Sequence, residues 1–303
     1  MKHTLDFFAL QSNLSLISLK GEDVCSFLQG QITNDINLVT EKNSIYAGFC
    51  NPKGRLLGFF HIIKFNNTYY LICPKDISES ILKKLSMYIL RANIHISLVK
   101  EIQLIGVIFN KKNNINSLLM NFPITHLQSS ICENVHITKI AGDNYRFIII
   151  GEDEFIDQFI QKNKIQLSQG LYETWKSQDI AHKIPNIYKE TQQEFIPQSL
   201  NLDLIEAINF KKGCYTGQEI VARTHYLGKI KRRMYQGTCK SKDNIIYGDE
   251  VLSNKEQVGR IIDFSSTNFE YNLLLELRVD AINKHLTVKN NIIHLPTEIH
   301  SLH

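Results

Sequence analysis

The first half of the chain predicts a similar order of elements twice, and this order constrains the fold most strongly. Alternating apolar and polar residues predict strands, and apolar residues at helical spacing predict helices. The first round comprises a strand at 14–19, a helix from Val24 to near Gly30, strands at 44–49, 55–65 and 68–73, a helix at 77–89 and a strand at 94–98. The second comprises a strand at 103–109, a helix near 114–120, strands at 135–140 and 145–150 and a helix at 152–161. We therefore expect two α+β units with antiparallel sheets, related as a degenerate repeat.

The last third of the chain predicts a different architecture. A helix at 171–182 is followed by an irregular passage at 185–203, and passages of this length without regular structure are usually functional. Short alternating runs then come at 234–238, 250–252, 257–264, 271–277 and 285–288. Several short strands at regular spacing predict a small antiparallel barrel or sandwich, which would form a separate C-terminal domain.

Composition is that of an ordinary globular protein. The 303 residues are 43% hydrophobic and 21% charged, which is enough chain for two or three domains. The first residues contain Asp6 and no continuous apolar core, and the apolar runs are far shorter than the ~18 to 20 residues of a membrane span. We therefore expect a cytoplasmic protein with no membrane partner. The six cysteines form no C-x-x-C pair, so neither a zinc site nor a thioredoxin-type redox pair is predicted, and reduced thiols fit that compartment.

The positive charge is mild in total but uneven along the chain. The formal charge is +4, and Lys229, Lys231, Arg232 and Arg233 follow closely behind the lysines at 211 and 212. This pattern predicts an anionic ligand or partner on that side, and the alternative is a solvated basic face.

The segment 211–223, KKGCYTGQEIVAR, carries the main chemical signal. Thr216 and Glu219 match a capping box, which predicts a helix start close behind Cys214. Backbone amides at a helix start stabilise a thiolate, and Lys211, Lys212 and Arg223 would add positive charge. These residues predict a nucleophile or a soft metal ligand at Cys214. The alternative is a buried structural cysteine.

The segment 195–235 resembles the YgfZ family of folate-binding proteins, which is related to the T-protein (aminomethyltransferase) of the glycine cleavage system. The family signature K-G-C-Y-x-G-Q-E is matched at Lys212, Gly213, Cys214, Tyr215, Gly217, Gln218 and Glu219. Further matches occur at 29–35 (QGQITND), at 52–55 (PKGR) and at Trp175 with Pro185 ten residues later. In the second of these, Asn51-Pro52-Lys53-Gly54 predicts a tight turn with glycine at a positive φ. The resemblance covers nearly the whole chain.

The resemblance implies a fold and a function. The fold would be a three-domain ring with antiparallel ferredoxin-like units and a C-terminal β-barrel, divided at 1–100, 101–228 and 229–303. Tetrahydrofolate or a related folate would bind in the central cavity. The protein would support assembly or repair of iron–sulfur clusters in client enzymes, including those that thiolate tRNA, together with scaffold proteins. An accessory factor is expected rather than an enzyme.

The resemblance also implies roles for individual residues. Activity would depend on Cys214 and Lys212, with a transient iron–sulfur cluster at Cys214. Trp175 would stack on the pteridine ring, and its alternative role is to fill a core. Lys211, Lys212 and Arg223 would meet the glutamate tail, where surface solvation is the alternative. The remaining cofactor-binding residues would be Tyr215 and Gln218.

Two departures from the family and two other functions bear on this interpretation. Leu14 stands where family members often have a tryptophan, and Asn51 stands where they often have an aspartate. One alternative function is an aminomethyltransferase, which requires an acid near the folate. The other is direct binding of tRNA, suggested by the basic run 229–233 and Tyr235.

Overall fold

The computed structural model describes residues 7–10, 13–109, 122–132, 134–142, 145–162, 168–169 and 172–296. The chain forms two compact units, each made of three stretches. Unit 1 comprises Met1–Gly30, Asp35–Ala47 and Phe60–Trp175, and unit 2 comprises Gln31–Asn34, Gly48–Phe59 and Lys176–His303. The helix expected near 114–120 lies outside the described residues. Because the two units are interleaved in sequence, each is described by itself.

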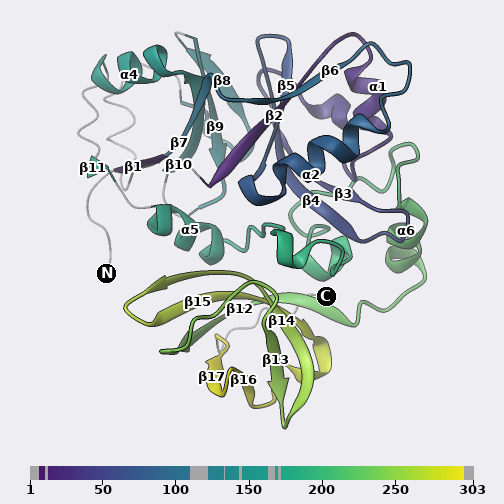
Figure 1. Ribbon diagram of the computed structural model, residues 1–303, viewed down its shortest axis with the longest axis vertical. Coiled ribbons are helices and arrows are strands. Elements are labelled where there is room, and N and C mark those ends of the chain that lie inside the picture. Colours follow the sequence, from purple (N-terminus) through teal and green to yellow (C-terminus); the bar gives the residue numbers. More distant parts are fainter. Residues whose placement is uncertain are drawn as a thin grey trace. The chain divides into compact units, whose positions relative to one another are not determined.

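The first sheet of unit 1 has the strand order β3-β4-β5-β2-β6. Its strands are β2 (Leu14–Lys20), β3 (Ile45–Cys50), β4 (Leu56–Phe65), β5 (Thr68–Pro74) and β6 (His95–Val99), and β3 and β4 run on into unit 2. Strand β2 pairs antiparallel with β5 and β6. The near-continuous apolar sequence of β4 is typical of a strand buried on both faces. Helix α1 spans Val24–Gln29, and α2 (Lys75–Ser86) packs against β2, β5 and β6 (Figure 1).

The second sheet of unit 1 has the order β11-β1-β7-β10-β9-β8. Its strands are β1 (Phe7–Leu10), β7 (Ile102–Phe109), β8 (Ser129–Cys132), β9 (Val135–Ile140), β10 (Tyr145–Glu152) and β11 (Ser168–Gln169). All of its pairs are antiparallel except the short one between β1 and β11. Helix α4 (Asp153–Lys162) contacts β7, β9 and β10 (Figure 1).

One hydrophobic core of unit 1 contains side chains from both of its sheets. Leu16 and Ile72 of the first sheet share this core with Ile148 and Ile150 of the second, and Trp175 belongs to it as well. The apolar faces predicted by the alternating strands therefore bury each other.

Unit 2 contains a closed barrel with the strand order β12-β15-β14-β13-β16-β17 (Figure 1). Its strands are β12 (Arg232–Lys240), β13 (Glu250–Ser253), β14 (Glu256–Thr267), β15 (Glu270–Arg278), β16 (Leu286–Val288) and β17 (Asn291–His294). Outside the barrel lie α6 (Gln218–Tyr226) and most of α5 (Tyr172–Ala181), with short 3-10 turns at Lys189–Thr191 and Pro197–Leu200. A third such turn, Val279–Ala281, connects β15 to β16. The passage 185–203 is irregular apart from two of these turns, as predicted.

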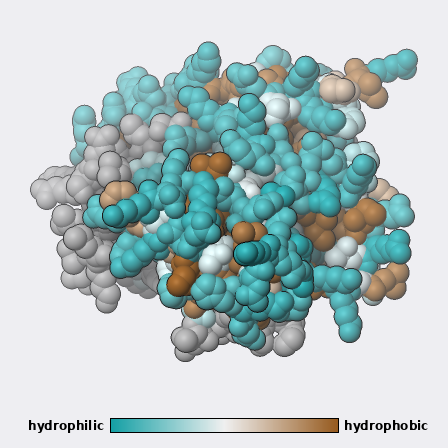
Figure 2. Space-filling view, turned by 60° about the horizontal axis from the view of Figure 1, so that its bottom comes forward, coloured by the Kyte–Doolittle hydropathy of each residue, from teal (hydrophilic) through white to brown (hydrophobic). Residues whose placement is uncertain are grey.

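The structure confirms the α+β class with antiparallel sheets and a C-terminal barrel. Because the strand order of the C-terminal sheet is closed, that part is a barrel and not a sandwich. The expected helix at 77–89 ends earlier, at Ser86. Strands β1, β8, β11 and β17 were not predicted. The domain boundaries at 100 and 228 and the ring arrangement stay predictions. Within the described ranges, the helices are all too short or too polar to cross a membrane. The face shown in Figure 2 is mainly hydrophilic, with apolar residues in small groups.

Candidate functional site

Lys212 joins two of the matched motifs inside unit 2. Its ammonium Nζ donates hydrogen bonds of 2.8 Å to the backbone carbonyl oxygens of Ile32 and Asn34, which belong to the motif at 29–35. The Nζ also lies 5.2 Å from the centre of the Tyr215 ring. Only 9% of Lys212 is exposed, so these contacts replace the water that a lysine normally keeps.

The segment 31–34 is anchored on its other side by backbone and side-chain hydrogen bonds. Thr33 Oγ1 donates to the carbonyl oxygen of Ala207 (2.7 Å) and accepts from the backbone N–H of Gly48 (2.7 Å). The Asn34 side-chain amide donates to the carbonyl oxygen of Glu206 (2.8 Å). Lys212 is therefore one member of a set of bonds that fixes this segment.

A third motif, the turn at 51–54, meets the start of α6 through two glycines. Gly54 has a φ of +68° and Gly217 a φ of +84°, both in the region that favours glycine. A Cβ on Gly217 would lie 2.5 Å from the carbonyl oxygen of Asn51 and 2.9 Å from Cα of Gly54. The side-chain oxygen of Asn51 accepts from the backbone N–H groups of Lys53 (2.9 Å) and Arg55 (3.1 Å) and so builds this turn.

The predicted capping box at Thr216 and Glu219 is wrong. Helix α6 begins at Gln218, its N-cap is Gly217, and no side chain caps it. The physical reason is the close approach of the 51–54 turn, which only a glycine at the N-cap permits. Arg223 lies in the last turn of α6 and cannot add charge at the helix start.

The cysteines fall into distinct environments. Cys214 is exposed, which excludes the alternative of a buried structural thiol. Cys50 and Cys73 are buried, and burial raises the pKa of each thiol to about 12, so both stay protonated at neutral pH. Burial, together with the neighbouring Cys50, also raises the pKa of Tyr215. Cys25 and Cys132 are half-buried and Cys239 is buried, so Cys214 is the most exposed of the six thiols.

The structure brings five of the six predicted cofactor-binding residues into one segment of unit 2. Lys211 and Arg223 are exposed, Gln218 is half-buried, and Lys212 and Tyr215 are buried. Trp175 is assigned to unit 1, where it is only 2% exposed. The guanidinium carbon of Arg146 lies 4.5 Å from the centre of its ring. The stacking role of Trp175 stays a prediction.

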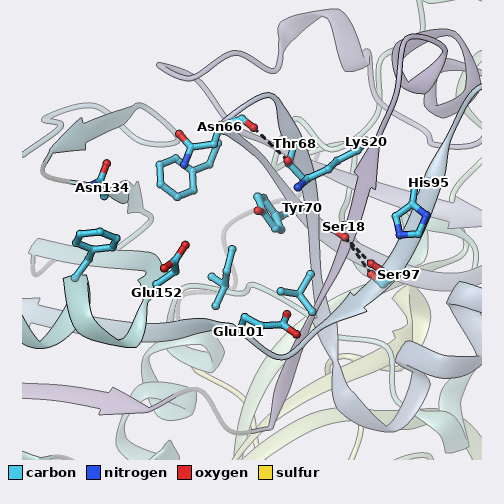
Figure 3. Close-up of a pocket in the computed structure, with 14 residues that line it drawn as sticks. Ser18, Lys20, Asn66, Thr68, Tyr70, His95, Ser97, Glu101, Asn134 and Glu152 are labelled. Carbon is cyan, nitrogen blue, oxygen red and sulfur yellow. Dashed lines mark hydrogen bonds between the residues drawn. The ribbon is translucent and has the colours of Figure 1, made fainter.

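Unit 1 contains a polar cavity of about 520 Å³ that none of these residues lines. Asn134 and Glu152 lie on one side of it and His95 and Ser97 on the other (Figure 3). Ser97 Oγ is 3.0 Å from Ser18 Oγ, so these two hydroxyl groups in the cavity wall already bond to each other. The mixture of acidic and basic side chains indicates no single ligand class.

Sequence reasoning missed a buried ionic network in unit 2. Lys176 Nζ lies 3.0 Å from Asp263 Oδ1 and donates to the Tyr247 hydroxyl at 2.6 Å, and the Tyr188 hydroxyl donates to Asp263 Oδ2 at 3.1 Å. Burial alone would lower the pKa of Lys176, but Asp263 and Tyr247 outweigh it and raise that pKa. The sequence signal was an aspartate within the apolar run of β14, at a register shift between Ile261 and Asp263.

Within the part of the chain that the structure describes, no group of three or more His, Cys, Asp or Glu residues is placed to hold a metal ion. Cys214 is thus not grouped with other candidate metal ligands among these residues.

Comparison with solved structures identifies the fold class. The structure is similar to the crystal structure of the glycine cleavage system aminomethyltransferase T from Bartonella henselae, with a TM-score of 0.76 over 97% of this chain and 86% of that chain. The two are 11% identical, so the likeness concerns the fold alone.

Sequence comparison then identifies the family. No family model matches. The tRNA-modifying protein YgfZ of Colwellia psychrerythraea is 31% identical over 74% of this chain and 69% of its own length. The proteins of the same name from Photobacterium profundum and Aliivibrio fischeri (strain MJ11) are 33% and 32% identical, over 77% and 88% of this chain and 70% and 82% of their own lengths. The chain belongs to the YgfZ family.

Proposed function

We propose that this chain is a folate-binding accessory protein that supports assembly or repair of iron–sulfur clusters in enzymes, including enzymes that thiolate tRNA. The observation that carries the proposal is the contact of three family motifs in unit 2. Buried Lys212 bonds to the 31–34 segment, the 51–54 turn packs against Gly217, and exposed Cys214 lies between these two residues in the sequence. The relatives' name, tRNA-modifying protein, supports the link to tRNA.

Cys214 is the residue that would act on a partner. A thiolate is both a nucleophile and a ligand for iron, and this thiol is exposed. Iron–sulfur clusters are usually held by four cysteine thiolates, so one thiol from this chain would share a cluster with ligands of the client or scaffold protein. The cluster is then cargo, not a resident cofactor.

Lys212 would act as a positioning residue. Its Nζ is engaged with two backbone carbonyl groups and its side chain is buried, so it holds the 31–34 segment against the turn that presents Cys214. Loss of Lys212 would act on activity through this geometry.

The residues present fit one end of a folate better than the other. Exposed Lys211 and Arg223 suit the carboxylates of the glutamate tail. Stacking of the pteridine on Trp175 has less support, because the ring is 2% exposed and Arg146 lies over it. When bound, a folate would supply one-carbon or pterin redox chemistry.

Calorimetric titration with tetrahydrofolate and recovery of a cluster enzyme in cells lacking this protein test the proposal together. The wild-type chain should bind folate. Cys214→Ala should still bind it but fail to restore the enzyme, whereas the half-buried Cys132→Ala serves as the matched control and should restore it. Absence of folate binding combined with full recovery by Cys214→Ala would refute the proposal.

An aminomethyltransferase is the second candidate, favoured by the fold. Its chemistry requires an acid near the folate, and the family resemblance would place one at Asn51, whose side chain is bonded to its own turn and to Gln193. Formation of methylenetetrahydrofolate from an aminomethyl-lipoyl carrier would establish this activity, and we expect none.

A further inference from the structure

Unit 2 contains a basic groove of about 510 Å³ that the folate proposal does not use. Its basic side chains come from the residue after the 51–54 turn, from the segment that follows α6, from the start of β12 and from β14. They are Arg55, Lys229, Lys231, Arg232 and Arg260. We call this cavity the basic groove.

The groove carries an excess of positive charge that its own acids do not cancel. Five basic and two acidic side chains line it, and arginines engage both acids. Arg232 Nη1 lies 2.7 Å from Oε2 of buried Glu276, and Arg260 Nε lies 3.8 Å from Oε2 of Glu194. Burial raises the pKa of Glu276, while the charges of Arg232, Arg260 and Arg55 oppose that rise. Arg232 therefore pairs directly with this buried carboxyl group, and the charges of Arg260 and Arg55 also favour its ionised form.

Two lysines remain available to a ligand. Lys229 and Lys231 are exposed, and within the described residues neither side chain has a hydrogen-bond or ion-pair partner. Arg55, by contrast, donates to the backbone carbonyl oxygen of Glu194. The arginines are thus held by partners within the protein, and the lysines provide exposed charges beside them.

We propose that the basic groove binds phosphate groups of an RNA backbone. Lysines bind phosphates as point charges, and such contacts supply affinity without reading sequence. The aromatic residue in the lining is Phe195, which is 2% exposed, so the groove offers no stacking surface for a base. The similarity to proteins named for tRNA modification favours RNA over another polyanion.

The basic groove shares its supporting elements with the signature segment. Gly54 contacts Ile220 of α6, and the next residue, Arg55, lines the groove. Thr224, one helical turn after Ile220, lines it as well. An RNA held there would contact the same turn and helix that support the KGCYTGQE segment.

Fluorescence anisotropy with unmodified tRNA and with a labelled single-stranded oligoribonucleotide tests this proposal over a range of KCl concentrations. The full-length double variant Lys229→Gln/Lys231→Gln is compared with Lys242→Gln/Lys255→Gln, which removes the same charge from exposed lysines outside the groove. If each groove lysine contacts one phosphate, the slope of log affinity against log salt for the single strand should fall by about 1.4. We expect at least tenfold weaker binding at low salt for the groove variant and little change for the control.

Three outcomes would overturn the proposal: no RNA binding by the wild-type chain, equal effects of the two double variants, or competition by poly-glutamate as strong as that by RNA of equal charge. The last would assign the groove to polycarboxylates. Circular dichroism of both variants checks folding. Folate calorimetry is a separate measurement, so failure of this proposal and failure of the proposed function are distinguishable.

Discussion

At the scale of single residues, Lys212 shows how a charge can be built into a protein interior. An ammonium group loses much of its hydration when buried, and it is tolerated where acceptors replace the water. The carbonyl groups of Ile32 and Asn34 and the face of Tyr215 do this. Because the acceptors lie about 180 residues away in sequence, loss of Lys212 would destabilise a segment from the other end of the chain.

Replacing Lys212 by methionine should therefore destabilise the protein. The substitution keeps an apolar stem but removes the ammonium donor from two carbonyl groups, at a cost of about 1–3 kcal/mol. The neighbouring Lys211→Met is the matched control, because Lys211 is exposed and such changes stay within about 0.5 kcal/mol. Urea unfolding measures both. Equal midpoints for the two variants would show that the Lys212 contacts carry no stability.

Two buried histidines of unit 1 predict sensitivity to acid. Burial, with smaller effects of His136 and His126, lowers the pKa of His61 to about 3, and burial lowers that of His136 to about 4. Within the described residues, Nδ1 of His61 and Nε2 of His136 are buried without a hydrogen-bond partner. Both rings therefore stay neutral in the folded protein at pH values where the unfolded chain binds protons.

The sign of the effect follows from these lowered pKa values. The unfolded histidines titrate near 6.5, so stability is complete above that pH and is lost as the pH falls toward 4 and 3. Each histidine should cost about 2 kcal/mol at pH 5 relative to pH 7. Urea unfolding at the two pH values should show this loss for the wild-type chain and a smaller one for His61→Asn/His136→Asn. Exposed His95→Asn is the control and should behave as wild type.

At the scale of elements, two glycines of one motif should respond differently to alanine. Gly217→Ala places a Cβ 2.5 Å from a backbone oxygen at a φ of +84°, whereas a Cβ on Gly213 meets nothing within 4 Å. We expect Gly217→Ala to lose about 1–3 kcal/mol, by strain at the junction of α6 with the 51–54 turn, and Gly213→Ala to lose less than about 0.5 kcal/mol. Thermal unfolding compares the two. A Gly217→Ala protein as stable as the Gly213→Ala protein would mean that the junction relaxes freely.

The ionic network should be a second weak point at this scale. Asp263→Asn removes the charge that compensates buried Lys176, and breaking a buried pair in this way costs about 3–5 kcal/mol. Asp280→Asn breaks the exposed pair with Arg278 and should cost less than about 1 kcal/mol. Urea midpoints of the two variants give the comparison, and similar losses would contradict a stabilising role for the buried pair.

Local sequence patterns predicted the elements whose signal is local. Alternation identified most strands of both sheets and the barrel, and the proline–glycine turn at 52–54 was correct. The start of α6 was predicted wrongly, because the contact that requires Gly217 comes from the distant Asn51. The short β1 was missed because its partner, β7, lies about a hundred residues away. Local patterns could not predict the partners of Lys212 and Lys176 either, because those partners are also distant in sequence.

At the scale of the whole molecule, the chain passes between the two units five times. Short stretches from the N-terminal half, Gln31–Asn34 and Gly48–Phe59, complete unit 2. Backbone bonds secure them: Leu56 N–H donates to the carbonyl oxygen of Phe195 at 2.8 Å, and Asn209 N–H donates to that of Thr33 at 3.0 Å. The motifs around Lys212 therefore depend on residues from both halves of the sequence.

A fragment that ends at residue 175 tests this dependence. It retains β2 and β5 with their mutual register, but it lacks Phe195, the acceptor for the Leu56 amide, and Ala207, the acceptor for Thr33 Oγ1. Hydrogen exchange followed by mass spectrometry should show the peptide covering 48–59 exchanging at least tenfold faster in the fragment than in the full chain. The peptide covering 68–74 should keep more of its protection, because its pairing partner remains. Equal protection of 48–59 in both would mean that this stretch folds without the C-terminal half. Each of the three motifs would then form independently, and their mutual contacts would form afterwards.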